Sequence, residues 1–273
     1  MCCWTVCPWR PPLSLPVDLV RSHSRGIAVP LNRRLITIAT TALALGTGHL
    51  TLAASLIPFD ATYTLSSGTT IVGETRLTLE HYGEQTYRYT SSSRATGFIG
   101  RLVGGNIEER SEGSFSSDQI RPAHYIYRRT GRKEREVLLE FDWLKAQVIN
   151  TINEDPWVMA IPSGTLDKLA VQLALMLDLD QGRQAMNYHI ADGGTLKDYH
   201  FKVAGRETIE TPLGLVETIR IKRDRGHAER YTEFWCAPQW GYAPVRIVQY
   251  RKGAEHARLS LRKITVGEVP SRK

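Results

Sequence analysis

The strongest restriction on the fold is a period-two alternation of apolar and polar residues that recurs over much of residues 57–266. One run, from position 71 to 79, places small or apolar side chains at every odd position and mainly polar ones between them. Similar runs cover 137–143, 199–203 and 215–221. Such alternation is typical of antiparallel strands that face a core on one side and water on the other.

Turn-forming pairs such as Thr130-Gly131 separate these runs. About eleven to thirteen strands fit between the turns, mostly in hairpin order. The sequence therefore predicts a mainly β fold, built as a strongly curved antiparallel sheet or a half-open β-barrel. In one of its strands, Leu215, Ile219 and Ile221 are expected to share the inward face.

Residues 166–180 break the alternation. Their apolar positions 166, 169, 170, 173, 174 and 177 follow the helical period, and further apolar residues widen that face. We expect one apolar helix here, with Leu173 covered. Ser163 and Thr165 are candidate N-caps, and Gly182 is the expected stop. Such a helix is expected to pack on the concave face of the sheet, where it plugs or flanks an apolar trough.

Residues 32–54 predict export. A short basic patch is followed by an uncharged, mostly apolar run at 35–45 and then by small residues. These are the parts of a secretory signal peptide, whereas a membrane-spanning helix needs about 20 apolar residues. The sequence therefore predicts a periplasmic protein with no transmembrane anchor in the mature chain.

The expected domain organisation follows from cleavage after Ala53. Residues 1–31 are then a leader that is atypical or wrongly assigned to the coding sequence. Residues 32–53 are the signal peptide, 54–266 a single all-β domain, and 267–273 a polar tail.

Charge and cysteine content restrict which partners and which stabilising bonds are expected. Of the 35 Lys and Arg residues five precede position 54, as does one of the 28 Asp and Glu residues, which leaves a net charge of +3. That balance does not call for nucleic acid as a partner. Cys236 is the sole cysteine after the signal peptide, so no intramolecular disulfide is expected, and the domain must be held by its core.

The sequence contains no recognisable catalytic constellation. It lacks a nucleophile elbow, a phosphate loop, a paired C-x-x-C and an H-E-x-x-H motif. The six histidines after the signal peptide are too far apart in sequence to form a local chelate. Cys236 follows two aromatics and is interpreted as a small core residue. No catalytic residue, metal or cofactor is therefore assigned, and the protein is predicted not to be an enzyme.

Two segments remain as candidates for ligand binding. The glycine-rich segment 97–105 carries apolar side chains that either cover a hydrophobic cavity or fold into the core. The segment 235–246 carries aromatics that either line a site or seal one end of the sheet. In this segment one strand is expected to end at Pro238 and the next to begin at Pro244. Together with the helix, these segments supply the candidate ligand-binding residues Phe98, Ile99, Leu102, Val103, Leu173, Trp235 and Trp240.

The pattern at 235–246, an aromatic strand running into Ala-Pro, a turn and Pro-Val-Arg, resembles the family DUF3108. Further pieces agree in order, among them Ser111-Glu112-Gly113, Phe141-Asp142-Trp143 and Thr211-Pro212-Leu213-Gly214. The resemblance covers about residues 57–264. It implies an exported bacterial envelope protein with no established activity. A looser similarity to periplasmic lipoprotein carriers implies a half-open barrel over an apolar cavity, although this chain offers one helix where carriers have several.

Three functional interpretations remain open. The first is a non-catalytic protein that binds an apolar or lipid-like ligand, or a protein partner, on its concave face. The second is a structural or assembly partner that acts through a sheet edge. The third is an envelope enzyme whose polar residues converge only in three dimensions.

Overall fold

The computed structural model describes residues 56–96, 105–131, 134–224 and 229–267. All of them belong to the second of two compact units, residues 51–273, which is the unit described below. The strands are β1 (Phe59–Ser67), β2 (Thr70–His81), β3 (Thr86–Ala95), β4 (Ile107–Phe115), β5 (Ile120–Arg129), β6 (Arg135–Asp142), β7 (Gln147–Ile152), β8 (Asp155–Ala160), β9 (Leu166–Asp167), β10 (Ala185–Asp192), β11 (Thr195–Thr211), β12 (Gly214–Asp224), β13 (Arg230–Ala237), β14 (Ala243–Arg251) and β15 (Ala254–Val266). The helices are α2 (Ala170–Asp180) and the 3-10 helix η1 (Pro238–Trp240).

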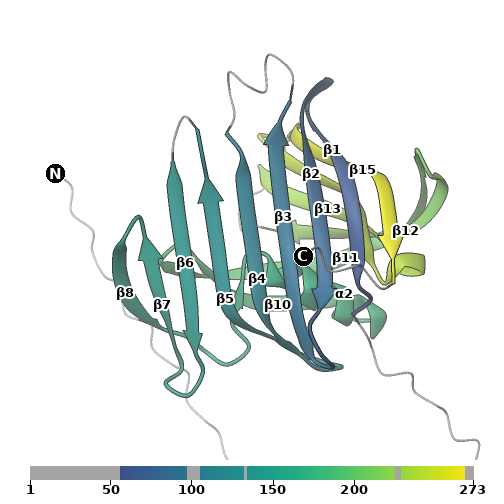
Figure 1. Cartoon of the computed structure of the whole chain (residues 1–273). Helices are drawn as coiled ribbons and strands as arrows, with labels where there is room; N and C mark the ends of the chain where they lie inside the picture. Colours follow the sequence, from purple (N-terminus) through teal and green to yellow (C-terminus); the bar gives the residue numbers. More distant parts are fainter. Residues whose placement is uncertain (1–55, 97–104, 132–133, 225–228, 268–273) are drawn as a thin grey trace, which may run out of the picture. The chain divides into compact units, whose positions relative to one another are not determined.

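All fifteen strands form one sheet that is not closed into a barrel, in the order β8-β7-β6-β5-β4-β3-β2-β1-β15-β14-β13-β12-β11-β10-β9 (Figure 1). Each strand therefore lies beside its sequence neighbours, except that β1 pairs with β15 and that β8 and β9 lie at opposite edges of the sheet. Every pairing is antiparallel apart from β9 with β10. The predicted curved, mainly antiparallel sheet with one apolar helix is confirmed, although it has more strands than the eleven to thirteen expected.

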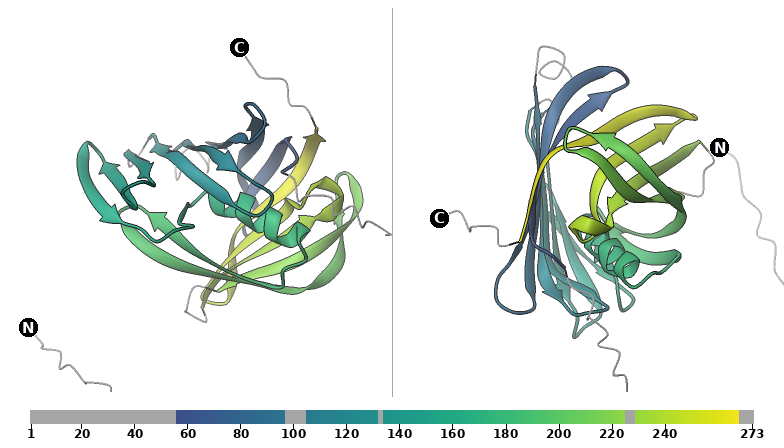
Figure 2. Two further views of the ribbon diagram at one scale, coloured as in Figure 1. Left: turned by 90° about the horizontal axis from the view of Figure 1, so that it is seen from below. Right: turned by 90° about the vertical axis from the view of Figure 1, so that its right-hand side faces the viewer.

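The sheet curls so that its two ends approach each other (Figure 2). Five residues, 161–165, connect the outer strand β8 to the other outer strand β9, and so short a segment spans about 20 Å at most. Trp157 of β8 also meets the β10–β11 turn, where a Cβ on Gly194 would lie 2.1 Å from the indole. Only glycine fits this contact, and Gly194 also has a φ of 92° that favours it.

Helix α2 lies inside the curl, between the strands of the two halves of the sheet (Figure 2). It contacts β5, β9 and β10. Nine of its eleven residues are buried, which fits a helix that is apolar nearly all round. No helix among the described residues is long and apolar enough to cross a membrane.

The helix begins later than the sequence pattern predicts. Leu166 and Asp167 form β9, and the helix starts at Ala170. Asp167, and not Ser163 or Thr165, satisfies the first amide groups: its Oδ1 accepts hydrogen bonds from the N–H of Leu169 at 2.8 Å and of Ala170 at 2.7 Å.

The other end of the helix agrees with the prediction. Helix α2 ends at Asp180, and Gly182 follows with a φ of 76°, a conformation that favours glycine.

The core lies on the concave face, where α2 packs against the inward side chains of the strands. The largest of these include Phe59, Tyr63, Tyr89 and Leu139, all with no exposed surface. The expected inward position of Leu215 is wrong, because its side chain is 76% exposed and Val216 is buried instead. The buried side of β12 changes where Thr218 and Ile219 are both buried, so the alternation at the two ends of this strand is out of phase.

Candidate functional site

The concave face contains a half-open cavity of about 340 Å³ beside the N-terminal end of α2. Strands from both halves of the sheet line it, together with the segment that enters the helix. Its lining residues are Leu65, Thr75, Leu77, Ser91, Ser93, Glu109, Lys168, Leu169, Gln172, Tyr199, Arg223, Thr232, Phe234, Ile247, Gln249, Ala257, Arg258 and Leu259.

The lining changes from apolar to polar along the strands. On β3 the inward residues are Tyr87 and Tyr89, then Ser91 and Ser93. The same change occurs from Phe234 to Thr232 on β13, from Ile247 to Gln249 on β14, and from Ile221 to Arg223 on β12. Because alternate residues of a strand share a face, each strand carries this gradient on its inward side. On β12, β13 and β14 the polar residues therefore form one row across the strands and the apolar residues the next, whereas on β2 and β3 the apolar Leu77 is opposite the polar Ser91.

Three cationic residues and one carboxylate are among the residues that line the cavity. The Arg223 guanidinium lies 4.5 Å from the ring centre of Tyr199 and donates a hydrogen bond to Thr232 at 3.1 Å. Arg258 pairs with Glu255. The third cation is Lys168, which pairs with Asp192 at 3.9 Å, and the carboxylate is Glu109. The N–H donors of these side chains suit a polar group that carries acceptor oxygens.

Side-chain hydrogen bonds connect β3, β4, β5 and β9 beside the cavity. The Ser111 hydroxyl donates to Asp167 Oδ2 at 2.6 Å and lies 3.0 Å from the Tyr87 hydroxyl, while the Tyr125 hydroxyl donates to Glu109 at 2.6 Å. Burial raises the pKa of Asp167 to about 6, against the lowering effect of its hydrogen bonds from Ser111 and two backbone amides. Burial also raises the pKa of Tyr125 and Tyr87 far above the ordinary value of a tyrosine. The hydrogen bond from Ser111 to Asp167 joins β4 to β9.

Comparison with known proteins identifies the family. The family model described as "Protein of unknown function (DUF3108)" matches residues 59–259. The chain belongs to the DUF3108 family. No curated protein matches this DUF3108 chain in sequence.

Two solved structures resemble this DUF3108 domain. One is a beta-barrel-like protein of the domain of unknown function DUF1849 from Brucella abortus, with 11% identity and a TM-score of 0.53 over 78% of this chain and 99% of that one. The other is a putative lipoprotein from Parabacteroides distasonis, with 10% identity and a TM-score of 0.35 over 77% of this chain and 96% of that one. The first likeness concerns the fold alone, because a fold does not fix a function.

The structure places the sequence-predicted binding residues of the DUF3108 domain apart from one another. Leu173 is fully buried in the filled core under the helix. Trp235 follows Phe234 on β13 and lies on the outer side, where its indole N–H donates to Glu207 at 2.7 Å. Trp240 packs against the core from η1. None of these three lines the cavity. The four remaining candidates, Phe98, Ile99, Leu102 and Val103, lie outside the described residues.

Sequence reasoning missed the polar lining of the cavity. The signal was present in the alternation, since Arg223 keeps the inward register of Ile219 and Ile221. Lys168 was hidden inside the segment assigned to the helix.

Cys236 matches its interpretation as a core residue. It is 2% exposed, and burial raises the pKa of its thiol to about 12, so it is not a thiolate near neutral pH. Within the described part of the chain, no group of three or more His, Cys, Asp or Glu residues is arranged to hold a metal ion.

Proposed function

We propose that this DUF3108 protein is a non-catalytic binding protein of the periplasm that holds an amphipathic, lipid-like ligand in its concave cavity. The observation that carries the proposal is the mixed lining, which combines apolar side chains such as Leu65, Leu77 and Phe234 with the polar groups of Arg223 and Lys168. An apolar chain gains free energy by burial against the first group, while a polar or anionic head group is matched by the second.

The size of the cavity supports this proposal. At about 340 Å³ it falls at the lower end of the range for small-molecule sites, roughly 300–1,000 Å³. Its position inside a curved sheet, beside a helix that fills the deeper core, leaves one open side through which a ligand enters. A titratable catalytic pair is not needed for such binding.

Ser93→Trp is expected to weaken binding of a fluorescent fatty acid at least about tenfold. Ser93 lines the cavity from β3, where its hydroxyl lies 2.8 Å from that of Thr75, so an indole there occupies ligand space. Fluorescence titration of the purified mature protein with cis-parinaric acid measures the effect.

Ser92→Trp is the matched control, because Ser92 is the preceding residue and faces the outer side of the same strand. It should bind the probe like the wild type. Equal affinity of all three proteins, or no binding by the wild type, would contradict the proposal. Mass spectrometry of lipids extracted from protein purified from its native envelope would identify the natural ligand.

Export is the second part of the proposal. Replacing Leu43 and Leu45 by Arg is expected to block export, because charges in the centre of an apolar signal segment cost about 2.5–3.5 kcal/mol each. Cell fractionation with an antibody against the protein measures where it accumulates. A processed, periplasmic double variant would show that residues 32–53 are not the export signal.

A second candidate function is assembly through a sheet edge. Strand β8 is an outer strand of the sheet, paired with β7 on one side, and its Val158 is 59% exposed. Such an edge offers backbone groups to an added strand of a partner protein. The enzyme alternative has less support, since Glu109 is the sole carboxylate and no histidine is among the described residues that line the cavity. If Glu109→Gln abolishes function while leaving probe binding unchanged, the enzyme interpretation replaces the binding one.

A further inference from the structure

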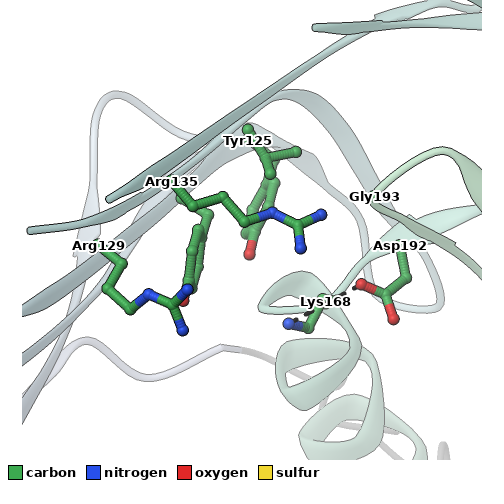
Figure 3. Close-up of a pocket in the computed structure, with 8 residues that line it drawn as sticks. Tyr125, Arg129, Arg135, Lys168, Asp192 and Gly193 are labelled. Atoms are coloured by element: carbon green, nitrogen blue, oxygen red, sulfur yellow. Dashed lines mark ion pairs between the residues drawn. The ribbon is translucent and has the colours of Figure 1, made fainter. Parts of the chain in front are cut away.

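A second, smaller cleft lies between the β5–β6 strands and the β10–β11 turn (Figure 3). Its volume is about 130 Å³, well below the range of drug-sized ligand sites but sufficient for a small ionic group. The lining residues are Tyr125, Tyr127, Arg129, Arg135, Val137, Lys168, Asp192 and Gly193.

The strand register brings the two arginines to this cleft. Arg129 on β5 and Arg135 on β6 are directly opposite each other, and the next inward pair is Tyr127 with Val137. All four therefore lie on the same face of the sheet. Lys168 reaches the cleft from the turn before α2 (Figure 3). Its ammonium lies 5.6 Å from the ring centre of Tyr127.

Gly193 allows Arg135 to approach the opposite wall. A Cβ at this position would lie 3.1 Å from Arg135 Nη2, and the φ of 56° also favours glycine. The cleft is therefore shaped around a guanidinium group that points into it.

Three cations and one carboxylate line the cleft. Like charges directly opposite each other on neighbouring strands are destabilising, as Arg129 and Arg135 are here. The single acidic residue of the lining, Asp192, already binds Lys197 at 2.5 Å and lies 3.9 Å from Lys168. Arg135 forms no ion pair with any residue that the structure describes. An anion beside Arg135 would give this guanidinium a partner.

We propose that Arg129, Arg135 and Lys168 bind a phosphate-like oxyanion in this cleft. The lining has three cations and one carboxylate, which suits a phosphate monoester with its charge of about −1.5 to −2 and three acceptor oxygens. Guanidinium groups match such oxygens with paired N–H donors, and the lysine adds a third donor from another direction.

The source of the oxyanion is either free phosphate or the head group of an amphiphile. Lys168 lines both this cleft and the larger cavity. The Tyr125 hydroxyl of the cleft donates a hydrogen bond to Glu109 of the cavity. A phosphate in the cleft therefore lies beside the space proposed for an apolar chain. The oxyanion site itself does not depend on that proposal.

Isothermal titration calorimetry on the mature protein at constant ionic strength tests the site, with inorganic phosphate in one arm and dihexanoyl phosphatidic acid in the other. The variant is Arg135→Gln, which keeps hydrogen-bonding capacity and removes the charge. Arg128→Gln is the matched control, because Arg128 is on the same strand but points to the outer side, where it pairs with Glu136 at 3.1 Å.

We expect Arg135→Gln to weaken binding at least about tenfold, and Arg128→Gln to leave it unchanged. Binding of inorganic phosphate identifies a free anion, whereas binding of the amphiphile alone identifies a head group. The proposal is overturned if neither probe binds the wild type, or if Arg128→Gln weakens binding as much as Arg135→Gln. Should Arg135→Gln fail to fold, Lys168→Gln takes its place and is expected to weaken binding while Arg128→Gln does not.

Discussion

Leu173→Asp is expected to abolish cooperative folding of the domain. Leu173 lies in the middle of α2 with no exposed surface, packed between the helix and the inner face of the sheet. A carboxylate there has no partner, and the substitution also removes a large apolar side chain. We expect the free energy of unfolding to fall by at least about 4 kcal/mol, a large part of the 5–15 kcal/mol that stabilises a typical domain.

Circular dichroism during thermal unfolding measures this effect. The chain offers a matched control in Leu144→Asp, the same replacement at a leucine that is 99% exposed in the β6–β7 turn. The control should melt within a degree or two of the wild type. If Leu173→Asp does the same, α2 is not an essential part of the core.

Asp167 should make the domain less stable as the pH rises from about 3.8 to about 6. Its pKa is raised from 3.8 to about 6 in the folded protein, chiefly by burial, so over this interval the folded state binds more protons than the unfolded state. Stability falls with pH wherever the folded state holds the extra proton. A difference of about two pKa units corresponds to about 3 kcal/mol, present below the lower pKa and lost above the higher one.

The comparison with Asp167→Asn isolates this contribution. An asparagine retains an oxygen for the amides of Leu169 and Ala170 and gains an N–H that can donate to Ser111. Relative to the wild type, the variant should therefore become more stable as the pH rises from about 4 to about 7. Urea unfolding at several pH values measures the difference.

Asp142→Asn is the control for the sign of this effect. The hydrogen bond from Lys145 lowers the pKa of Asp142, so its ionised form stabilises the folded state. Relative to the wild type, this variant should become less stable as the pH rises through the acidic range, which is the opposite sign to Asp167→Asn. A pH-independent difference for Asp167→Asn would show that Asp167 titrates normally.

The sequence predicted the architecture because the inward face of each strand is read by alternation alone. It underestimated the number of strands where turns lack glycine. The hairpin between β7 and β8 turns at Asn153 and Glu154, which both have positive φ although neither is glycine. The helix was placed four residues early because Leu166 and Leu169 fit the helical period even though the first lies in a short strand.

The site was predicted less well, for two physical reasons. Three consecutive buried residues, Phe234, Trp235 and Cys236, hide which face each one occupies, so the sequence could not show that Trp235 points away from the cavity. The second reason is distance along the chain. Arg129 and Arg135 are opposite each other on adjacent strands, but Lys168 joins them only because the ends of the sheet approach each other, and no local pattern encodes that approach.

The pairing of β1 with β15 also fixes the order in which this chain can complete its structure. Phe59 pairs with Val266, so the central seam of the sheet joins the first and last strands to be synthesised. The early strands can form hairpins as they emerge, but β1 lacks its second neighbour until the end of the chain is available. Contacts between residues so distant in sequence form slowly because a long loop must close first. Until then the edge of β1 is open, which leaves the incomplete sheet exposed to wrong pairing and keeps it available to chaperones.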